Sequence, residues 1–248
     1  MDLEQKLQQL QNWIAECENI VFFGGAGVST ESGIPDFRSE NGIFAAINEY
    51  GYQPEVILSH SFFMEHPEIF FQYYKKNLLY PDAKPNDCHK ALAKLEEMGK
   101  LRSVITQNID DLHQKAGSKR VLELHGTLYK NYCMQCRKTF DLAYVTKENG
   151  ITRCENCGGI VRPDVVLYEE GLDENTIQNA VKDIAKADML IVGGTSLNVY
   201  PAAGLLHYFR GNHLVLINKS VTSMDKKADL VISENIGEVF RKVVLEKH

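Results

Sequence analysis

Four cysteines form the clearest metal-binding pattern in the sequence. They make two C-x-x-C pairs, and the four residues are Cys133, Cys136, Cys154 and Cys157. Four thiolates at this spacing suit a tetrahedral zinc ion, and because they leave no position open for water or substrate, the zinc would be structural. Four unrelated buried cysteines, a redox pair and a nucleic-acid-binding zinc ribbon are the alternatives. A redox role is disfavoured because neither pair begins a helix after a strand.

A group of polar residues follows the apolar segment 101–106, which we expect to be a strand. Gln107, Asn108 and Asp110 stand directly after it. Ligands of parallel sheets bind beyond the carboxyl ends of the strands, so these side chains could bond a carboxamide or a ribose. The alternative is a turn in which Asp110 or Asp111 caps the next helix.

His125 is the histidine best placed to act as a general base. It is one of eight histidines, and it stands in LELHG, at the end of an expected strand and beside the cysteine segment. An imidazole has a pKa near neutral pH, which suits a group that takes up and returns a proton. The alternative is a histidine with a purely structural role.

A glycine turn follows the apolar segment 20–23. Gly25 and Gly27 have the spacing of a loop that lets the backbone approach a pyrophosphate. Thr30, however, stands where a dehydrogenase-type loop has its third glycine, and helix breakers follow it. If this loop binds a dinucleotide, it does not bind it as a dehydrogenase does.

A second glycine turn has the same character. Gly194, Thr195 and Ser196 follow a buried apolar segment, and Asn218 ends the next one. These residues could bind a phosphate or a ribose. Each signal is weak alone, but four polar strand ends together favour one ligand site along the edge of a sheet.

Strands alternate with helices along most of the chain. Strands are expected at 20–23, 101–106, 120–126, 188–194, 213–218 and 228–233, and helices at 2–17, 86–99, 173–187, 200–209 and 236–247. This alternation is typical of an α/β fold with a doubly wound, Rossmann-like parallel sheet and helices on both faces.

Two stretches break the alternation, and we expect them to form a smaller, inserted domain. Residues 36–80 look helical, and residues 126–163 hold the cysteines of a zinc-ribbon module. The larger, Rossmann-like domain would then consist of residues 1–35, 81–125 and 164–248.

The composition is that of an ordinary soluble globular protein. The chain has 248 residues, of which 44% are hydrophobic and 24% charged, and a formal net charge of -6. The negative charge gives no electrostatic case for nucleic acid, no apolar run approaches the ~20 residues of a membrane span, and the N-terminus shows no secretion signal. We therefore expect a cytoplasmic monomer that binds neither nucleic acid nor a membrane.

Taken together, the motifs closely resemble those of the sirtuins, NAD-dependent protein deacylases, and most of all the compact bacterial members. GAGVSTESGIPDFR, TQNIDDLH, LELHG, the paired cysteines, PDVVLYEE, GTSL and IN occur in the family's order over nearly the whole chain. The resemblance implies that NAD is a consumed substrate and that the activity is NAD-dependent protein-lysine deacetylation. Mono-ADP-ribosyl transfer, and a zinc-ribbon NAD-sensing module without turnover, are the alternatives.

The resemblance also implies the residues that contact NAD. They are Gly25, Ala26, Gly27, Thr30, Ile34, Asp36, Phe37, Arg38, Gln107, Asn108, Ile109, Asp110, Gly194, Thr195, Ser196, Asn218, Lys219, Asn235 and Ile236. The first loop would hold the pyrophosphate and cover the ribose, and the segment 108–110 with Ile34 would line the nicotinamide pocket. The turns from Gly194 onward would hold the adenosine half.

The chemistry that the resemblance implies uses Asn108, Asp110 and His125. The first two residues would bond the carboxamide of nicotinamide and make it a better leaving group. The amide oxygen of the acetyl-lysine would then attack the C1′ carbon. His125, as general base, would deprotonate a ribose hydroxyl so that the 2′-oxygen can attack the resulting imidate. Water would complete the release of lysine and 2′-O-acetyl-ADP-ribose.

The peptide substrate would bind along an extended strand. By resemblance, that strand comprises Val165, Val166, Leu167, Tyr168 and Glu169. The family commonly has glycine after the aromatic residue, and we expect Glu169 at that position to narrow the peptide preference or to favour basic flanking residues.

The acyl group is expected to be uncharged. Family members that prefer negatively charged acyl groups carry a tyrosine and an arginine after the FR motif, whereas the segment 39–51 has no arginine. Phe44 and Ile47 in this segment suggest an apolar tunnel for acetyl or longer uncharged chains.

Overall fold

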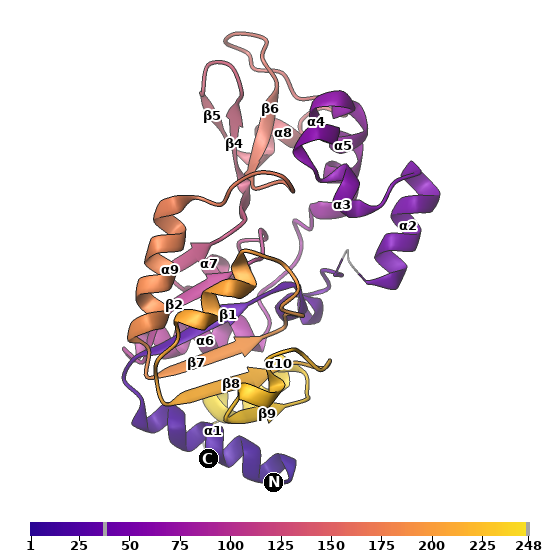
Figure 1. The fold of residues 1–248 in the computed structure, drawn as a ribbon. Helices are drawn as coiled ribbons and strands as arrows, with labels where there is room; N and C mark the ends of the chain where they lie inside the picture. Colours follow the sequence, from indigo (N-terminus) through magenta and orange to yellow (C-terminus); the bar gives the residue numbers. More distant parts are fainter. Residues whose placement is uncertain (37–38, 247–248) are drawn as a thin grey trace.

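The larger part of the molecule is built on a six-stranded parallel sheet with the strand order β3-β2-β1-β7-β8-β9 (Figure 1). The computed structural model describes residues 1–36 and 39–246, so the predictions for Phe37 and Arg38 lie outside the described residues. The strands are β1 (Ile20–Gly24), β2 (Leu101–Thr106), β3 (Val121–Glu123), β7 (Met189–Gly193), β8 (His213–Ile217) and β9 (Leu230–Ile232).

Helices cover both faces of this sheet. They are α1 (Leu3–Glu16), α6 (Asp87–Glu97), α7 (Leu112–Lys115), α9 (Glu174–Lys186) and α10 (Ile236–Phe240), with the 3-10 helix η4 (Ala202–Tyr208) and the π-helix η6 (Arg241–Leu245). Successive residues of a strand point to opposite faces. Phe22 accordingly packs in one hydrophobic core with α1, α6 and α10, while Phe23 packs in a second core with α9 and η4. The prediction of a doubly wound α/β fold is confirmed.

The smaller part combines a three-stranded antiparallel sheet with short helices. The sheet has the order β5-β4-β6, from β4 (Gly126–Cys133), β5 (Thr139–Phe140) and β6 (Val161–Val165). The helices are α2 (Glu40–Tyr50), α3 (Pro54–Ile57), α4 (His60–Glu65), α5 (Pro67–Tyr73) and α8 (Leu142–Thr146), with the π-helix η3 (Tyr74–Leu78). A third hydrophobic core, rich in phenylalanine, joins both insertions. The domain boundaries themselves stay a prediction.

Three expected elements differ in detail. The helix expected at 200–209 is a 3-10 helix, and the last helix changes from α to π at Arg241. The strand expected at 120–126 ends at Glu123, because the chain must turn there to enter β4. Gly126, the first residue of β4, leaves that turn with φ 72°, and a Cβ atom at this position would lie 2.0 Å from the Asp164 carbonyl oxygen. The turn therefore requires glycine.

The order of the strands determines where a ligand can bind. The chain leaves β1 toward β2 and β3 on one side, and continues with β7, β8 and β9 on the other. Open α/β sheets bind ligands at such a switch point, outside the carboxyl ends of the strands. Within the described ranges, no helix is both long enough and apolar enough to cross a bilayer.

Candidate active site and metal centre

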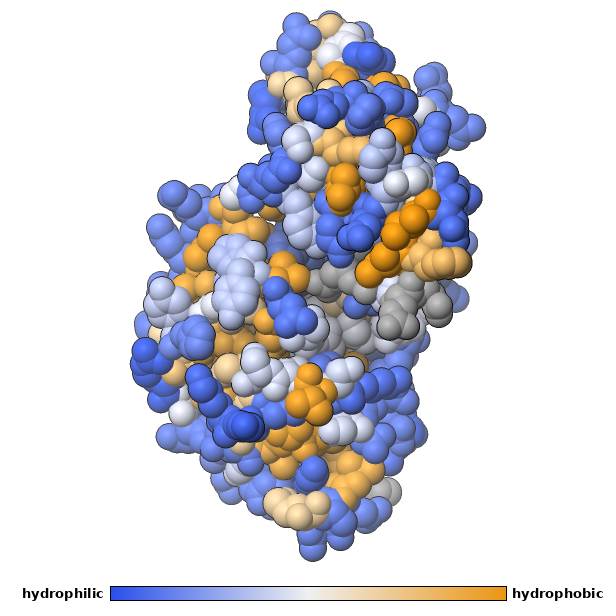
Figure 2. All heavy atoms as spheres, turned by 45° about the vertical axis from the view of Figure 1, so that its right-hand side comes forward, coloured by the Kyte–Doolittle hydropathy of each residue, from blue (hydrophilic) through white to orange (hydrophobic). Residues whose placement is uncertain are grey.

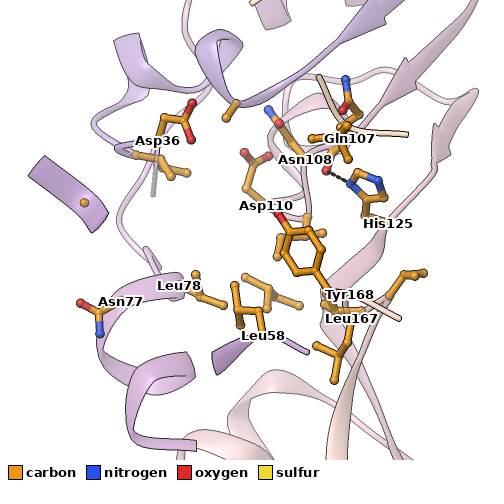
Figure 3. Close-up of a pocket in the computed structure, with 18 of the residues that line it drawn as sticks. Asp36, Leu58, Asn77, Leu78, Gln107, Asn108, Asp110, His125, Leu167 and Tyr168 are labelled. Carbon is orange, nitrogen blue, oxygen red and sulfur yellow. Dashed lines mark hydrogen bonds between the residues drawn. The ribbon is translucent and has the colours of Figure 1, made fainter. Parts of the chain in front are cut away.

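A pocket of about 610 Å³ lies between the carboxyl ends of the sheet and the smaller part of the molecule (Figure 3). The predicted site residues that line it are Ala26, Ile34, Asp36, Gln107, Asn108, Ile109, Asp110, His125, Val165, Val166, Leu167, Tyr168 and Glu169. Figure 3 shows Asn108, Asp110 and His125 on one side of the pocket, facing Leu58 and Leu78 on the other. Figure 2 shows hydrophobic residues spread over one face of the molecule, some of them at the junction of the two parts. The pocket thus unites the nicotinamide, base and peptide residues of the prediction.

The remaining predicted NAD residues lie in the turns that follow β1, β7 and β8 and at the start of α10. They are Gly25, Gly27, Thr30, Gly194, Thr195, Ser196, Asn218, Lys219, Asn235 and Ile236. The first two turns pack directly on each other, because the Gly27 N–H donates to the Gly194 carbonyl over 2.8 Å. A Cβ atom on Gly27 would lie 2.8 Å from the Cα of Gly194, so these glycines are required by the contact between the turns as well as by any ligand.

Asn108 and Asp110 are joined through a residue that the sequence analysis missed. The Asn108 Nδ2 donates to the Ser29 Oγ over 3.0 Å, and the Ser29 hydroxyl donates to the Asp110 Oδ2 over 2.6 Å. Burial raises the pKa of Asp110, and the bonds from Ser29 and from the Leu112 N–H oppose that rise. Leu112 is the first residue of α7, so its bond to Asp110 shows that this carboxylate also caps the helix, as the alternative interpretation predicted. Ser29 stands in the glycine loop itself, which was its only signal in the sequence.

His125 is oriented by the loop that carries Asn108. Its Nδ1 lies 3.0 Å from the Gln107 carbonyl oxygen. A carbonyl oxygen can only accept a hydrogen bond, so Nδ1 carries the proton and Nε2 is the basic nitrogen of the neutral ring. The side chain of Gln107 points elsewhere and donates to the Thr195 Oγ1 over 3.1 Å. Gln107 therefore links the base to the turn after β7.

The predicted peptide strand leaves β6 and pairs with the segment that connects α3 to α4. The Val166 N–H donates to the His125 carbonyl over 2.9 Å, and the Tyr168 N–H donates to the Leu58 carbonyl over 3.0 Å. Regular strand geometry ends at Val165. The segment beyond it is thus held between the base and the smaller part by backbone hydrogen bonds.

The effect of Glu169 on peptide preference stays a prediction, but the structure gives its carboxylate a partner within the chain. Its backbone has φ 78°, in the left-handed region, as a glycine would. Its carboxylate accepts from the Ser61 N–H and from the Ser61 hydroxyl, each over 2.9 Å. The side chain therefore fastens the peptide segment to the first turn of α4.

Glu170 adds a second fastening that the sequence did not reveal. It accepts from Arg162 Nη1 over 2.6 Å and from the Leu167 N–H over 2.8 Å, and it lies 2.9 Å from the His60 Nδ1. Burial raises its pKa, but the hydrogen bonds from Arg162, Leu167 and His60 outweigh this and lower the pKa to about 2. Glu170 is therefore ionised throughout the physiological range.

The apolar wall of the pocket comes from other residues than the sequence suggested. Phe44 is 68% exposed and Ile47 41% exposed, so the expectation that they line a tunnel is wrong. Both lie on the outer face of α2, because residues three apart share one face of a helix. Among the described residues, the inner face of α2 brings Ala45 and Ala46 to the pocket, opposite Leu58. The wall is apolar, as expected.

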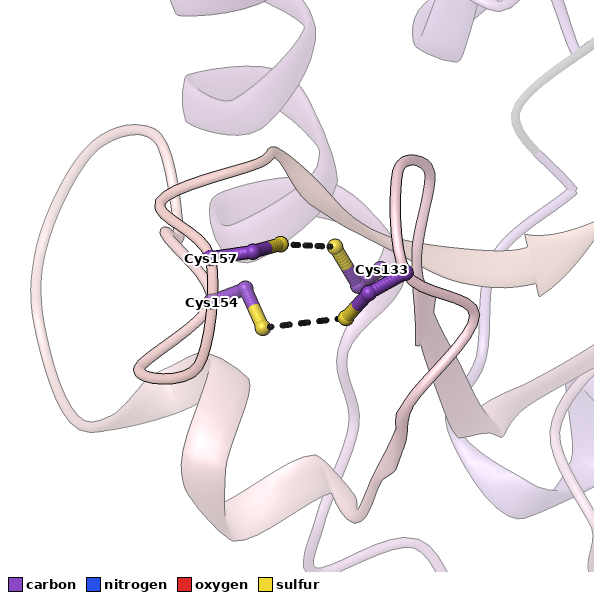
Figure 4. A group of neighbouring side chains, drawn as sticks. Cys133, Cys154 and Cys157 are labelled. Carbon is purple, nitrogen blue, oxygen red and sulfur yellow. Dashed lines mark hydrogen bonds between the residues drawn. The ribbon is translucent and has the colours of Figure 1, made fainter.

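The four predicted cysteines meet in the smaller part (Figure 4). Their sulfur atoms lie within 4.8 Å of one another, with 3.4 Å between Cys133 and Cys157 and 3.7 Å between Cys136 and Cys154. A zinc–sulfur distance of about 2.3 Å in a tetrahedron gives sulfur–sulfur distances of about 3.8 Å. The Lys138 backbone N–H lowers the pKa of the Cys136 thiol, which favours a metal-binding thiolate. The donor set therefore fits a structural zinc ion.

Comparison with known proteins gives consistent results. Residues 25–201 match the Sir2 family. An NAD-dependent protein deacetylase of Clostridium acetobutylicum is 61% identical over 245 residues, which cover 98% of this chain and 100% of that protein. A solved structure described as the basis for the mechanism and regulation of Sir2 enzymes superposes with a TM-score of 0.87 at 39% identity, covering 98% of each chain. A Sir2 complex with the inhibitor EX-527, 2′-O-acetyl-ADP-ribose and deacetylated p53 peptide superposes with a TM-score of 0.83 at 37% identity, covering 95% of this chain and 96% of the other.

Proposed function

Because the chain belongs to the Sir2 family, we propose that it is an NAD-dependent protein-lysine deacetylase that uses NAD as a substrate. The observation that carries the proposal is the pocket that brings Asn108, Asp110 and His125 together against the peptide segment 165–169. A binding module without turnover would need no general base such as His125 beside the residues that bind nicotinamide. The products would be nicotinamide, the free lysine and 2′-O-acetyl-ADP-ribose.

The nicotinamide half of NAD would lie in the pocket beside Asn108 and Asp110. These two side chains offer an amide and a carboxylate, which complement the carboxamide of nicotinamide. Ser29 fixes both of them by hydrogen bonds, so the site is prepared before NAD binds. The glycine turns after β1 and β7 would hold the pyrophosphate and the adenosine half.

The first chemical step would break the bond between C1′ and nicotinamide. The amide oxygen of the acetyl-lysine attacks C1′, and nicotinamide leaves with the bonding electron pair. This step needs orientation of the two reactants more than it needs a base. The peptide segment and the nicotinamide residues line the same pocket, which supplies that orientation.

His125 would act in the second step. The neutral ring, with its proton on Nδ1, offers Nε2 to a ribose hydroxyl. Proton removal lets the 2′-oxygen attack the imidate carbon, the lysine amine leaves, and water provides the last oxygen. His125 returns its proton during this release, so the enzyme ends in its starting state.

The peptide would bind by its backbone to the segment 165–168. Such pairing gives affinity with little dependence on sequence. We propose an acetyl-lysine protein or peptide as the partner. The zinc ion would be held by the four cysteines and would supply a cross-link within the smaller part. Four metal-binding thiols suit a reducing compartment such as the cytoplasm, and the monomeric state stays a prediction.

The proposal is tested by incubating the protein with NAD and an acetyl-lysine peptide and measuring all products by mass spectrometry. We expect nicotinamide and free lysine peptide in equal amounts, with 2′-O-acetyl-ADP-ribose, and neither free lysine peptide nor 2′-O-acetyl-ADP-ribose from the His125→Ala variant. Addition of an ADP-ribosyl mass to protein, with the acetyl group intact, would instead establish a transferase. If NAD were not consumed with any acyl peptide, the protein would be a binding module without turnover.

A further inference from the structure

The residues on both sides of His125 in the chain contact one acidic residue that the proposed mechanism does not use. The Thr127 hydroxyl donates to the Asp111 Oδ1 over 2.6 Å, and Asp111 lies close enough to the Glu123 carboxyl to raise its pKa. Glu123 ends β3 and Thr127 lies in β4, so His125 stands between the two contacts. Resting on the proposed function, we propose that Asp111, Glu123 and Thr127 are positioning residues that hold the turn carrying His125 against the nicotinamide loop.

Backbone hydrogen bonds show that this turn lies along the nicotinamide loop. The Leu124 N–H donates to the Thr106 carbonyl over 2.9 Å, and the Leu128 N–H donates to the Ile109 carbonyl over 3.1 Å. The contact of Thr127 with Asp111 continues this alignment on the far side of His125. Thr127 is only 3% exposed, so its hydroxyl bond is shielded from water.

The backbone conformation of Asp111 indicates that its position in the loop is constrained. It has φ 57°, in the left-handed region that residues other than glycine rarely adopt. Strained backbone persists where the surroundings hold it, and it is frequent near functional sites. Asp111 directly follows Asp110, so the same loop carries a nicotinamide residue and the anchor for the base.

The Glu123 carboxyl keeps its proton up to about neutral pH and can share it with Asp111. Burial raises the pKa of Glu123 to about 7; a hydrogen bond from Gln114 opposes the rise, and the charge and hydrogen bond of Asp111 add to it. Lys130 on β4 also favours the charged form of Glu123. Two other charged groups nearby are bonded to partners of their own. The Lys115 Nζ on α7 donates to the Tyr129 hydroxyl over 2.6 Å, and the Asp110 carboxylate accepts from the Ser29 hydroxyl.

Loss of the shared proton would loosen the turn. Below about pH 7, the protonated Glu123 donates to Asp111 while Thr127 holds the other side. Above it, two negative charges face each other across the turn that carries His125. The step that needs His125 would then slow, whereas the earlier loss of nicotinamide would not.

The first test compares Thr127→Val, which keeps the shape but removes the hydroxyl, with Thr127→Ser, which keeps it. Two rates are measured on the zinc-bound protein, deacetylation of an acetyl-lysine peptide and exchange of labelled nicotinamide into NAD. Exchange reports the step before His125 acts. We expect Thr127→Val to lower kcat for deacetylation by about tenfold to a hundredfold, with exchange within about twofold of the wild type, and Thr127→Ser to restore both.

An equal fall of both rates in Thr127→Val, or unchanged deacetylation, would overturn the proposal. A wild-type protein that shows neither reaction would overturn the proposed function, and this inference with it. The second test is the pH profile of kcat for Glu123→Gln, whose amide stays neutral and can still donate to Asp111. We expect the wild-type kcat to fall above about pH 7 and the variant to lack that fall. Identical profiles would contradict the shared-proton account.

Discussion

Ser29 shows how a single hydroxyl can organise the nicotinamide site. It accepts from Asn108 and donates to Asp110, two residues about 80 positions away in the chain. Ser29 is only 1% exposed, so water does not compete for the hydrogen bonds of its hydroxyl. The two residues proposed to recognise the carboxamide therefore depend on a side chain that need not touch it.

The Ser29→Ala variant should lower kcat/KM for NAD by about tenfold or more. Asn108 loses its acceptor, and the pKa of Asp110 rises because the Ser29 bond that lowers it is gone. Steady-state kinetics at saturating peptide measures the change. Ser118→Ala is the matched control, since Ser118 is a buried serine whose hydroxyl has no partner among the described residues. Equal kinetics for the two variants would remove Ser29 from the site.

Two buried histidines make the fold sensitive to acid. His89 and His113 lie 4.6 Å apart between ring centres, and burial lowers the pKa of His89 to about 4 and that of His113 well below its usual value. The unfolded chain binds these protons below about pH 6.5 while the folded chain does not. Stability should therefore fall as pH drops from 6.5 to 4, by up to about 1.4 kcal/mol per pH unit for each histidine.

Denaturant unfolding at several pH values measures this loss. The control is His213→Gln, because His213 is partly exposed and stacks on Trp13 outside the buried pair. The slope of the unfolding free energy against pH should be the same for His213→Gln as for the wild type, whereas the slope for His113→Phe should be less steep. A wild-type stability that does not change between pH 7 and pH 5 would contradict the buried neutral pair.

At the scale of elements, we expect α2 to decide which acyl chains fit the pocket. Its inner face carries Ala45 and Ala46, and its outer face carries Phe44 and Ile47. The sequence predicted an apolar wall because this segment is rich in apolar residues. It could not show which residues face inward, since that depends on how the helix packs against α3 and the neighbouring loops.

Filling the inner face of α2 should shorten the acyl chain that the enzyme accepts. The Ala46→Leu variant places three more carbons against the pocket, so turnover of a butyryl-lysine peptide should fall at least about tenfold relative to acetyl-lysine. Ile47→Ala, on the exposed face of the same helix, should leave the ratio unchanged. The measurement is the ratio of kcat/KM for the two peptides, and an unchanged ratio in Ala46→Leu would place the acyl group elsewhere.

The elements themselves were largely readable from the sequence. Apart from β3, the strands of the larger sheet are mainly apolar and are followed by glycine or polar residues, so burial and turn chemistry agree at these strand ends. Local patterns could not predict the contacts between segments that lie far apart in the sequence. The carboxylate of Glu169 is one example, because its bond to Ser61 joins residues 108 positions apart.

At the scale of the molecule, the zinc centre and the pocket share one hydrophobic core. Cys133 and Cys154 belong to the third core, together with Leu58 and Leu128 from the wall of the pocket. A change at the metal centre should therefore alter the wall of the pocket beside the peptide segment. The sequence predicted the metal from spacing alone, but not this shared core.

Removal of zinc should unfold the smaller part and abolish activity. The expected content is one zinc ion per chain, and a chelator or Cys154→Ala should remove it and lower the melting temperature, because structural zinc contributes folding energy directly. Cys17→Ala, at a buried cysteine outside the cluster, should keep the metal. Metal analysis with thermal unfolding makes the test, and full activity of a zinc-free protein would contradict a structural role.

The central claim is that the acetyl-lysine oxygen attacks C1′ of NAD, and one isotope measurement tests it most directly. The peptide carries ¹⁸O in its acetyl group, the reaction is quenched quickly, and the acetyl-ADP-ribose is hydrolysed and analysed by mass spectrometry. We predict that the label appears in the ADP-ribose and not in the acetate. Label found in the acetate would mean that the acetyl group reaches the ribose with its own oxygen, so that the amide oxygen does not attack C1′.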